Sequence, residues 1–189
     1  MTFPSEQDLL KAAQAFNLDA LAVIYDRYSP GIYRYAMRFL GDESLAEDCV
    51  SETFSRFLKT LRAGQGPRDH LQAYLYRIAH NLVTDSFRRQ PPPPLELDEN
   101  LRADEALHPE SLVDGRLEAG RVRLALRALT PEQSQVVMLR YVEGWDNSEV
   151  AAALQKPVGA VKALQHRAVA TLRRLLDKNE RTGVYETQS

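Results

Sequence analysis

The sequence has few of the features that mark secreted, membrane or disulfide-stabilised proteins. Cys49 is the single cysteine among 189 residues, so the chain can form no internal disulfide. No apolar run approaches the ~20 residues that a membrane-spanning helix needs. The N-terminal segment also lacks a basic stretch followed by an apolar one, which a secretory signal would show. These absences predict a cytoplasmic protein that does not insert into a membrane.

Motifs for catalysis and for metal binding are missing as well. The sequence has no Gly-rich phosphate loop and no nucleophile beside a plausible base. Its histidines are dispersed and show no ligand spacing: His70, His80, His108 and His166. We therefore expect no metal site, no cofactor and no enzymatic activity.

Strand-like alternation of polar and apolar residues is absent, whereas apolar residues recur at steps of three and four. This pattern predicts an all-α fold. The first half is expected to form helices near 5–16, 18–29, 31–40, 43–61 and 69–89. The second half is expected to form helices near 117–128, 131–142, 147–154 and 158–177, with Thr130 capping the second of these ahead of Pro131.

Four consecutive prolines, Pro91 to Pro94, divide the chain, because they cannot lie inside a helix. Residues 90–118 carry eight acidic and two basic side chains, a net charge of −6. This composition predicts two small helical domains, 1–89 and 117–177, joined by a flexible, acidic, Pro-rich linker at 90–116. A tail follows at 178–189.

Residues 147–176 have the pattern of a helix-turn-helix. Asn147 or Ser148 can cap the first helix, and Pro157 suits the first turn of the second. The second helix repeats apolar residues from Val161 to Leu175, and its other side carries Lys162, Ala163, His166 and Arg167. Residues 119–178 have ten basic and five acidic side chains, as phosphate contact requires. Helix pairs that merely face solvent can share this pattern, so both interpretations stay open here.

Leu71, Leu75, Ile78 and Leu82 mark the core side of the predicted helix 69–89, and a second polar row lies on a neighbouring side. Tyr74, Arg77, Asn81 and Arg88 follow one another at steps of three, four and seven. An aromatic ring, an amide and cations together can hold single-stranded nucleic acid. An amphipathic helix that only faces solvent often carries the same residue types, so that interpretation also stays open. The preceding loop, from Arg62 to His70, is polar and basic enough to cup an unstacked base.

Acidic side chains lie off the apolar stripe of the predicted helix 43–61. They are Glu47, Asp48 and Glu52, the last two spaced to share one face. This row fits either a solvated face or a docking face for a basic partner.

Three blocks now resemble a known family: ESLAEDCVSETFSRFLK, AYLYRIAHNLVTDSFRR and LTPEQSQVVMLRYVEGWDNSEVAAALQKPVGAVKALQHRA. In this order they are similar to the extracytoplasmic-function (ECF) group of sigma-70-type factors, over nearly all of residues 18–176. The resemblance implies a dissociable subunit of bacterial RNA polymerase that directs the core enzyme to promoters and helps to open them. Many such factors are held inactive by an anti-sigma protein.

The resemblance also implies roles for particular residues. The acidic row would dock on the polymerase clamp helices. Asn81, flanked by Tyr74 and Arg77, would recognise the minus-ten element of promoter DNA. Lys162, His166 and Arg167 would read the minus-thirty-five element from the recognition helix.

The sequence departs from the family pattern at three positions, Gln155, Ala163 and Leu164. Many members have glycine at the first, and serine and arginine at the other two. The recognition helix is therefore less basic here, which leaves its base contacts open. A free-standing helix-turn-helix regulator is the alternative function, but it gives the row on 69–89 no purpose.

Overall fold

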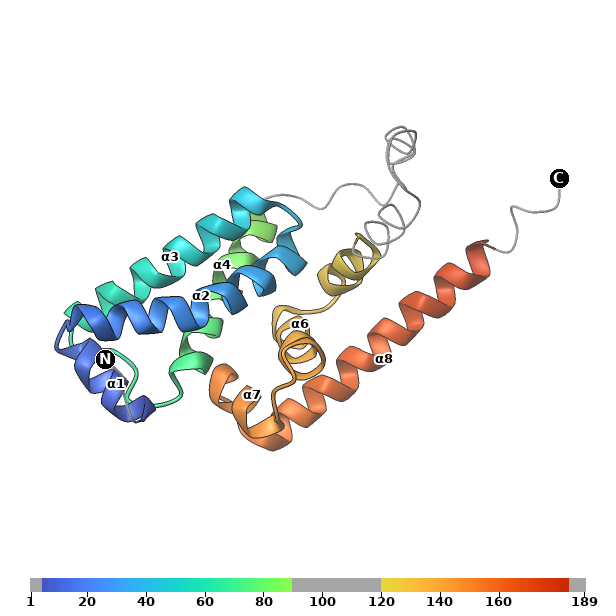
Figure 1. Ribbon diagram of the computed structural model, residues 1–189. Helices are drawn as coiled ribbons and strands as arrows, with labels where there is room; N and C mark the ends of the chain where they lie inside the picture. The colour runs from blue at the N-terminus through green and yellow to red at the C-terminus, as the bar shows by residue number, and fades with distance from the viewer. Residues whose placement is uncertain (1–4, 90–119, 184–189) are drawn as a thin grey trace.

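The protein is described here by a computed structural model, which covers residues 5–89 and 120–183 (Figure 1). Helices and short turns make up all of this part, so the predicted all-α fold is confirmed for it. No helix in these two ranges is long and apolar enough to cross a bilayer. The predicted linker at 90–116 and the last residues of the predicted tail, 184–189, lie outside the described residues.

The N-terminal half consists of four helices: α1 (Glu6–Gln14), α2 (Leu18–Leu40), α3 (Glu43–Arg62) and α4 (Leu71–Arg89). Side chains of Ser5, Asn17 and Asp42 accept backbone N–H groups at the starts of the first three. Gly41 ends α2 in the left-handed conformation, with a φ of 69°. Helices α2, α3 and α4 pack on one another, and α1 closes one end of the group (Figure 1).

The predicted break between 18–29 and 31–40 is wrong, because α2 runs unbroken through Pro30. Pro30 is exposed, so its ring faces water and costs the helix one backbone hydrogen bond. The buried side chains Ile24, Tyr28, Ile32 and Tyr35 continue as one stripe across the proline. Burial of that stripe outweighs the local preference of proline to end a helix.

The C-terminal half begins with helical residues 120–127, followed by α6 (Pro131–Val137), a π-helical turn η3 (Met138–Val142), α7 (Asn147–Leu154) and α8 (Val158–Gly183). Thr130 caps α6 as predicted. It does so in a reciprocal capping box, in which Thr130 and Gln133 each accept the other's backbone N–H. The expected single α-helix over 131–142 instead changes to π geometry for its last five residues.

The π turn places two side chains at the boundary between the two halves of the molecule. Glu143 N donates to Met138 O at 3.0 Å and Trp145 N to Leu139 O at 2.9 Å, which is wider than α-helical spacing. The chain then turns at Gly144, whose φ is 74°. As a result, Glu143 and Trp145 both face α4 of the N-terminal half.

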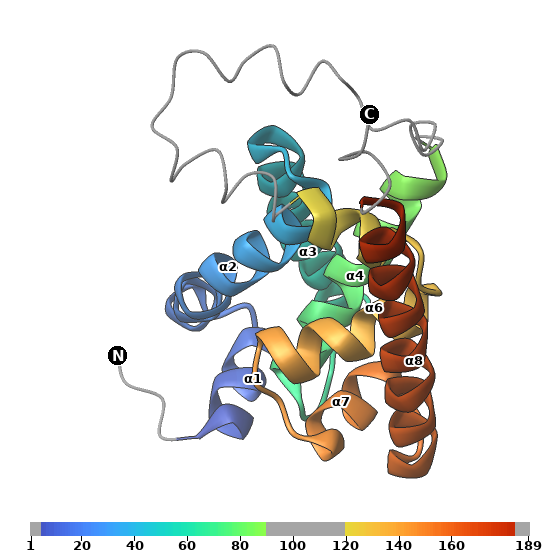
Figure 2. The same ribbon diagram turned by 90° about the vertical axis from the view of Figure 1, so that its right-hand side faces the viewer.

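The two halves of the molecule pack directly on each other. Helix α4 packs on α2 and α3 on one side and on α7 on the other, so it lies between the two groups (Figure 2). Tyr76 and Trp145 meet across this boundary with ring centroids 5.0 Å apart. Buried apolar residues form one continuous core that runs through both halves.

This packing changes the buried side of α4. Leu71 and Leu75 are fully buried, as predicted for the core side of this helix. Ile78 and Leu82, expected beside them, are only partly buried. Burial extends to a second side of the helix, which carries Tyr76, Ala79, His80 and Val83.

Candidate nucleic-acid and polymerase interface

The polar row on α4 is partly assembled and partly open to solvent. The Arg77 guanidinium lies over the Tyr74 ring, 5.2 Å from its centroid. Tyr74 also packs at 6.2 Å against Phe57 of α3, and the ring is partly buried. Asn81, one turn further along, is exposed, with its amide free to reach a ligand. The row therefore presents a supported aromatic–cation pair beside an accessible amide.

The two other cations of the predicted minus-ten set lie at opposite ends of this domain. Arg88 is exposed in the last turn of α4 and lies 3.8 Å from Asp85, as a surface ion pair. Arg62 ends α3 and stacks over Phe16 at 5.6 Å, so it flanks the loop and not the row itself. The structure brings Tyr74 and Arg77 together, but it does not bring Arg62 or Arg88 into contact with them.

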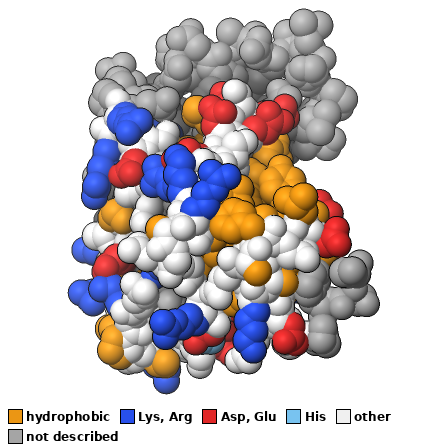
Figure 3. Space-filling view, turned by 90° about the vertical axis from the view of Figure 1, so that its left-hand side faces the viewer, with side chains coloured by type: hydrophobic (Ala, Val, Ile, Leu, Met, Phe, Trp, Pro, Cys, Tyr) orange, Lys and Arg blue, Asp and Glu red, His pale blue; other side chains and the backbone are white. Residues whose placement is uncertain are grey.

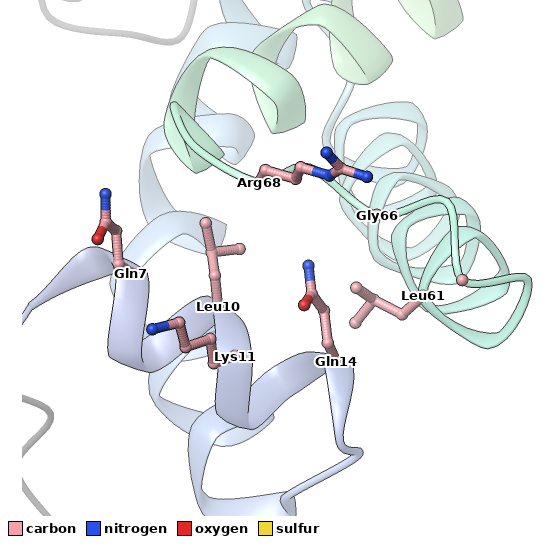
Figure 4. Close-up of a pocket in the computed structure, with 8 residues that line it drawn as sticks. Gln7, Leu10, Lys11, Gln14, Leu61, Gly66 and Arg68 are labelled. Carbon is pink, nitrogen blue, oxygen red and sulfur yellow. The ribbon is translucent and has the colours of Figure 1, made fainter.

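The loop between α3 and α4 borders a cavity of about 420 Å³ (Figure 4). Gly64 adopts a φ of 68° in this loop, which turns the backbone sharply. Gln14 from α1 and Leu61 from α3 point toward the space beside Arg68 (Figure 4). The lining combines amides, cations and an apolar floor: Gln7, Leu10, Lys11, Gln14, Leu61, Gly64, Gly66 and Arg68.

Helix α1 holds this loop in place, a role that sequence reasoning missed. Gln14 Nε2 donates to Pro67 O at 3.2 Å. Leu71 N donates to the Glu6 carboxylate at 3.1 Å, so a residue of α1 satisfies a free amide at the start of α4. These contacts join residues 53 and 65 positions apart, and no local pattern signals them.

The acidic row on α3 is a charged surface beside apolar side chains. Glu47 and Asp48 are exposed. Glu52 accepts from Arg56 Nε at 2.8 Å, and this bond lowers the pKa of Glu52. Figure 3 shows one face of the molecule, on which an exposed apolar strip is bordered by both basic and acidic side chains. Tyr25 of α2, 48 % exposed, stacks on Phe54 of α3 at 4.8 Å, so large apolar groups reach the surface near this row.

The helix-turn-helix is confirmed in outline, with a different cap from the one expected. Asp146, not Asn147 or Ser148, caps α7 and accepts the N–H groups of Ser148 and Glu149. These bonds lower the pKa of the Asp146 carboxyl. Gln155 ends α7 in the left-handed conformation, with φ 53° and ψ 43°. Gln155 thus adopts the left-handed backbone conformation that glycine usually provides at the end of a helix.

Helix α8 separates a buried side from an exposed side, as its periodicity predicts. Val161, Leu164 and Ala168 are buried against the core of the C-terminal half. Leu164 is therefore a core residue, and its difference from the family pattern removes nothing from the exposed side. The predicted recognition residues are all exposed: Lys162, Ala163, His166 and Arg167.

The fold and these surfaces define a helical protein with two modules, one of them a helix-turn-helix of the kind that enters DNA grooves. Residues 24–91 match the family model of sigma-70 region 2, and residues 119–172 match that of sigma-70 region 4. The chain is 38% identical over 179 residues to the ECF RNA polymerase sigma factor BldN of Streptomyces coelicolor, covering 92% of this chain and 67% of BldN. The chain belongs to the ECF RNA polymerase sigma factor family.

Further relatives agree with this membership. SigX of Bacillus subtilis, also an ECF RNA polymerase sigma factor, is 26% identical over 165 residues, covering 84% of each chain. The solved structure of CnrH in complex with the cytosolic domain of CnrY is similar with a TM-score of 0.66 at 26% identity. That match covers 92% of this chain and 97% of the other.

Proposed function

We propose that this chain directs core RNA polymerase to specific promoters and assists their opening, as a cytoplasmic factor that makes and breaks no covalent bond. The observation that carries the proposal is that one chain has two separate surfaces with the residue types that suit nucleic-acid binding. One is the Tyr74–Arg77–Asn81 row on α4, and the other is the exposed side of α8. A duplex reader alone needs only the second surface.

In this proposal, residues 1–89 dock on the polymerase and recognise the minus-ten element. Opening requires that a base leave the stack, and the cavity beside Arg68 offers amides and a cation to such a base. Stacking and hydrogen bonding of an unpaired base contribute about 1–3 kcal/mol, which offsets the cost of unpairing. Asn81 reads a base edge, and Arg62, Arg77 and Arg88 neutralise phosphates.

Residues 117–177 read the minus-thirty-five element through Lys162, Ala163, His166 and Arg167. Two cations in this group supply few phosphate contacts, so the domain alone binds DNA weakly. The polymerase holds both domains near the promoter, and the linker at 90–116 converts the second contact into a tethered one of high effective concentration. The tail, 178–189, is assigned no role.

Glu47, Asp48 and Glu52 provide the docking face for core polymerase. An exposed acidic row beside exposed aromatic surface suits a partner with basic and apolar groups. We also include an anti-sigma protein among the partners, as the family resemblance implies. The solved structure of CnrH, which is similar to this chain, contains a partner chain, CnrY.

In vitro transcription with core polymerase and a promoter library tests the function directly. The chain should select a defined set of promoters that core enzyme alone does not use, and sequencing of the transcripts would give both elements. A chain that binds duplex DNA tightly without polymerase, and leaves transcript selection unchanged, would instead be a free-standing regulator.

A further inference from the structure

Two arginines and a tyrosine of the N-terminal half gather around a carboxylate. The Tyr76 hydroxyl of α4 donates to Glu143 Oε2 at 2.9 Å, and the Arg38 guanidinium of α2 forms an ion pair with Glu143 Oε1 at 3.9 Å. Arg34 lies one helical turn before Arg38, and both arginines are exposed. These side chains offer donors around the two oxygens of one anion. We call Arg34, Arg38 and Tyr76 the anion cluster.

Gly31 of α2 gives the hydroxyl its place at the centre of the anion cluster. A Cβ at this position would lie 2.6 Å from the Tyr76 hydroxyl and 3.9 Å from Arg34 Nη2, so a larger residue would displace the hydroxyl. The backbone of Gly31 is helical, and glycine is less stable than alanine inside a helix. The glycine is therefore explained by the close approach of the hydroxyl to α2.

The surface of α2 around the cluster is positively charged. Arg27 lies seven residues before Arg34, so Arg27, Arg34 and Arg38 share one side of the helix, and all three are exposed. Burial and the charge of Glu143 raise the pKa of Tyr76, whereas Arg34 and Arg38 lower it. The hydroxyl thus stays protonated near neutral pH and remains a donor. The cluster combines one fixed neutral donor with two cations.

The carboxylate of Glu143 shows which chemistry the anion cluster accepts. A carboxylate and a phosphodiester each present oxygens that share one negative charge, and arginine recognises both groups. Arginine and tyrosine side chains are also among the usual phosphate contacts of DNA-binding proteins. A cluster that holds one oxygen of Glu143 by a hydroxyl and the other by a guanidinium can therefore hold a backbone phosphate in the same way.

We propose that the anion cluster binds a backbone phosphate of promoter DNA, in the duplex that leads from the minus-ten to the minus-thirty-five element. This inference rests on the function proposed above, because it adds a duplex contact to the same promoter reading. The phosphate takes the place of the Glu143 carboxylate when the C-terminal half lies on its own element. Arg27, roughly 10 Å further along α2, extends the positive surface beside the duplex.

The position of the cluster on α4 separates it from the row proposed for unpaired bases. At about 100° per residue, Tyr76 faces a side of the helix well away from Tyr74 and Asn81. Its ring packs against Tyr35 of α2 with centroids 5.3 Å apart, so the hydroxyl is the part of Tyr76 offered to an anion. Donors without an open aromatic face suit a phosphate and carry no base sequence. The cluster thus positions duplex DNA, whereas the row on α4 reads bases.

Methylphosphonate interference with the full-length chain in the holoenzyme tests the anion cluster. In each probe, one phosphate of a promoter selected by the wild-type holoenzyme carries a neutral methyl group in place of a charged oxygen. The modified phosphates are placed one at a time along the duplex between the two elements. Wild-type binding should fall about ten-fold at one or two positions, where a charge-assisted hydrogen bond is lost. In Arg34→Ala with Arg38→Ala, the same positions should change binding by less than two-fold.

Two single substitutions separate the phosphate contact from general effects of charge. Tyr76→Phe keeps the ring and its packing but removes the donor, so it should weaken binding to the unmodified promoter and reduce the interference at the same phosphates. Lys59→Ala removes an exposed cation from α3 and should keep both the affinity and the interference of the wild type. Weaker binding of the double variant with an unchanged interference pattern would give the arginines a structural role only and overturn the proposal.

Binding to core polymerase provides the second readout. If the double variant on α2 loses binding to core enzyme, the surface contacts protein and the assignment to DNA is wrong. Failure of the proposed function has a different result, because the wild-type holoenzyme would then select no promoter, which refutes the cluster as well. A chain that selects promoters while Arg34, Arg38 and Tyr76 make no difference refutes the cluster alone.

Discussion

Gln155 holds the turn of the helix-turn-helix in a backbone conformation that disfavours any residue with a Cβ. Its φ of 53° lies in the left-handed region, and its side chain is exposed. Gln155→Gly removes this steric cost and should raise the free energy of unfolding by up to about 1 kcal/mol. Urea or thermal unfolding measures the change.

The matched control is the same type of change inside a regular helix. Ala170 is exposed in α8, where glycine gains no conformational advantage. Ala170→Gly should lower stability by about 0.5–1 kcal/mol. Equal effects of the two substitutions would contradict the strain assigned to Gln155.

Asn81 offers the clearest single-residue test of minus-ten recognition. It is exposed on α4, so Asn81→Ala should leave folding unchanged. It should lower promoter opening about ten-fold, because a hydrogen-bonding pair to a base is worth about 1–3 kcal/mol. Permanganate reactivity of the promoter in the presence of the holoenzyme measures opening. Binding of the variant to core polymerase should be normal, and unchanged opening would remove Asn81 from the site.

Residue-level prediction from the sequence succeeded where the signal is local. Thr130 precedes proline at the first turn of α6, and the structure confirms it as the cap. Asp146 was overlooked because three neighbouring side chains can all cap a helix, and only the backbone geometry selects among them. The periodicity of α8 places Leu164 on the apolar side of the helix, and the structure shows it buried in the core.

At the scale of the element, α3 carries the proposed docking face. Asp48→Arg with Glu52→Arg should weaken binding to core polymerase at least ten-fold, because two attractive charges become repulsive toward a basic partner. Glu52→Arg also faces Arg56, which costs the isolated helix only a few tenths of a kcal/mol. Co-purification and fluorescence anisotropy with core enzyme measure the loss.

A charge reversal on the C-terminal half controls for net charge. Glu132 is exposed on α6 and bonds Lys156 at 2.8 Å at the surface. Glu132→Arg should leave polymerase binding close to that of the wild type. The docking face is refuted if the double reversal on α3 binds core enzyme normally, or if both variants lose binding equally.

The recognition helix α8 gives a prediction in the salt dependence of binding. Lys162 is exposed, and if it contacts a phosphate, Lys162→Ala should reduce the slope of log binding constant against log salt concentration by about one unit. The holoenzyme on a promoter fragment is the sample. Lys59→Ala on α3 is the control and should leave the slope unchanged. If the slope measured for Lys162→Ala equals that of the wild type, this lysine does not contact DNA.

Helix boundaries show which elements could be predicted from the sequence. Periodicity located α1, α3, α4, α7 and α8 closely, since each has a repeating buried stripe. It failed at Pro30, where the stripe of α2 continues through a residue that usually ends a helix. It also failed at the π turn, because the wider hydrogen bonds at Met138–Val142 serve contacts with α4 that are distant in sequence.

The contact between the two halves could not be predicted at all from the sequence. Tyr76 and His80 resemble ordinary polar residues of an amphipathic helix, and Glu143 resembles a surface acid. Tyr76 and His80 are buried against Glu143, Trp145 and Pro131, which lie more than 50 positions along the chain. The loop cavity is similar in this respect, since α1 closes it through contacts with Pro67 and Leu71. Sequence patterns indicate which faces are polar, but not which of them meet.

Trp145 can report the arrangement of the whole molecule, because it is the single tryptophan of the chain and lies at the contact between the halves. It is 6 % exposed and packs against Tyr76. In a chain labelled with 5-fluorotryptophan, we expect unlabelled core polymerase to shift the one ¹⁹F resonance. The minus-ten and minus-thirty-five elements are named for positions about 25 base pairs apart, roughly 85 Å of duplex, and α4 and α8 cannot reach both while α7 packs on α4. Promoter DNA without polymerase should leave the resonance in place. If polymerase binds and the resonance stays where it was, the closed packing persists in the holoenzyme, and the two domains do not reach the promoter by separating.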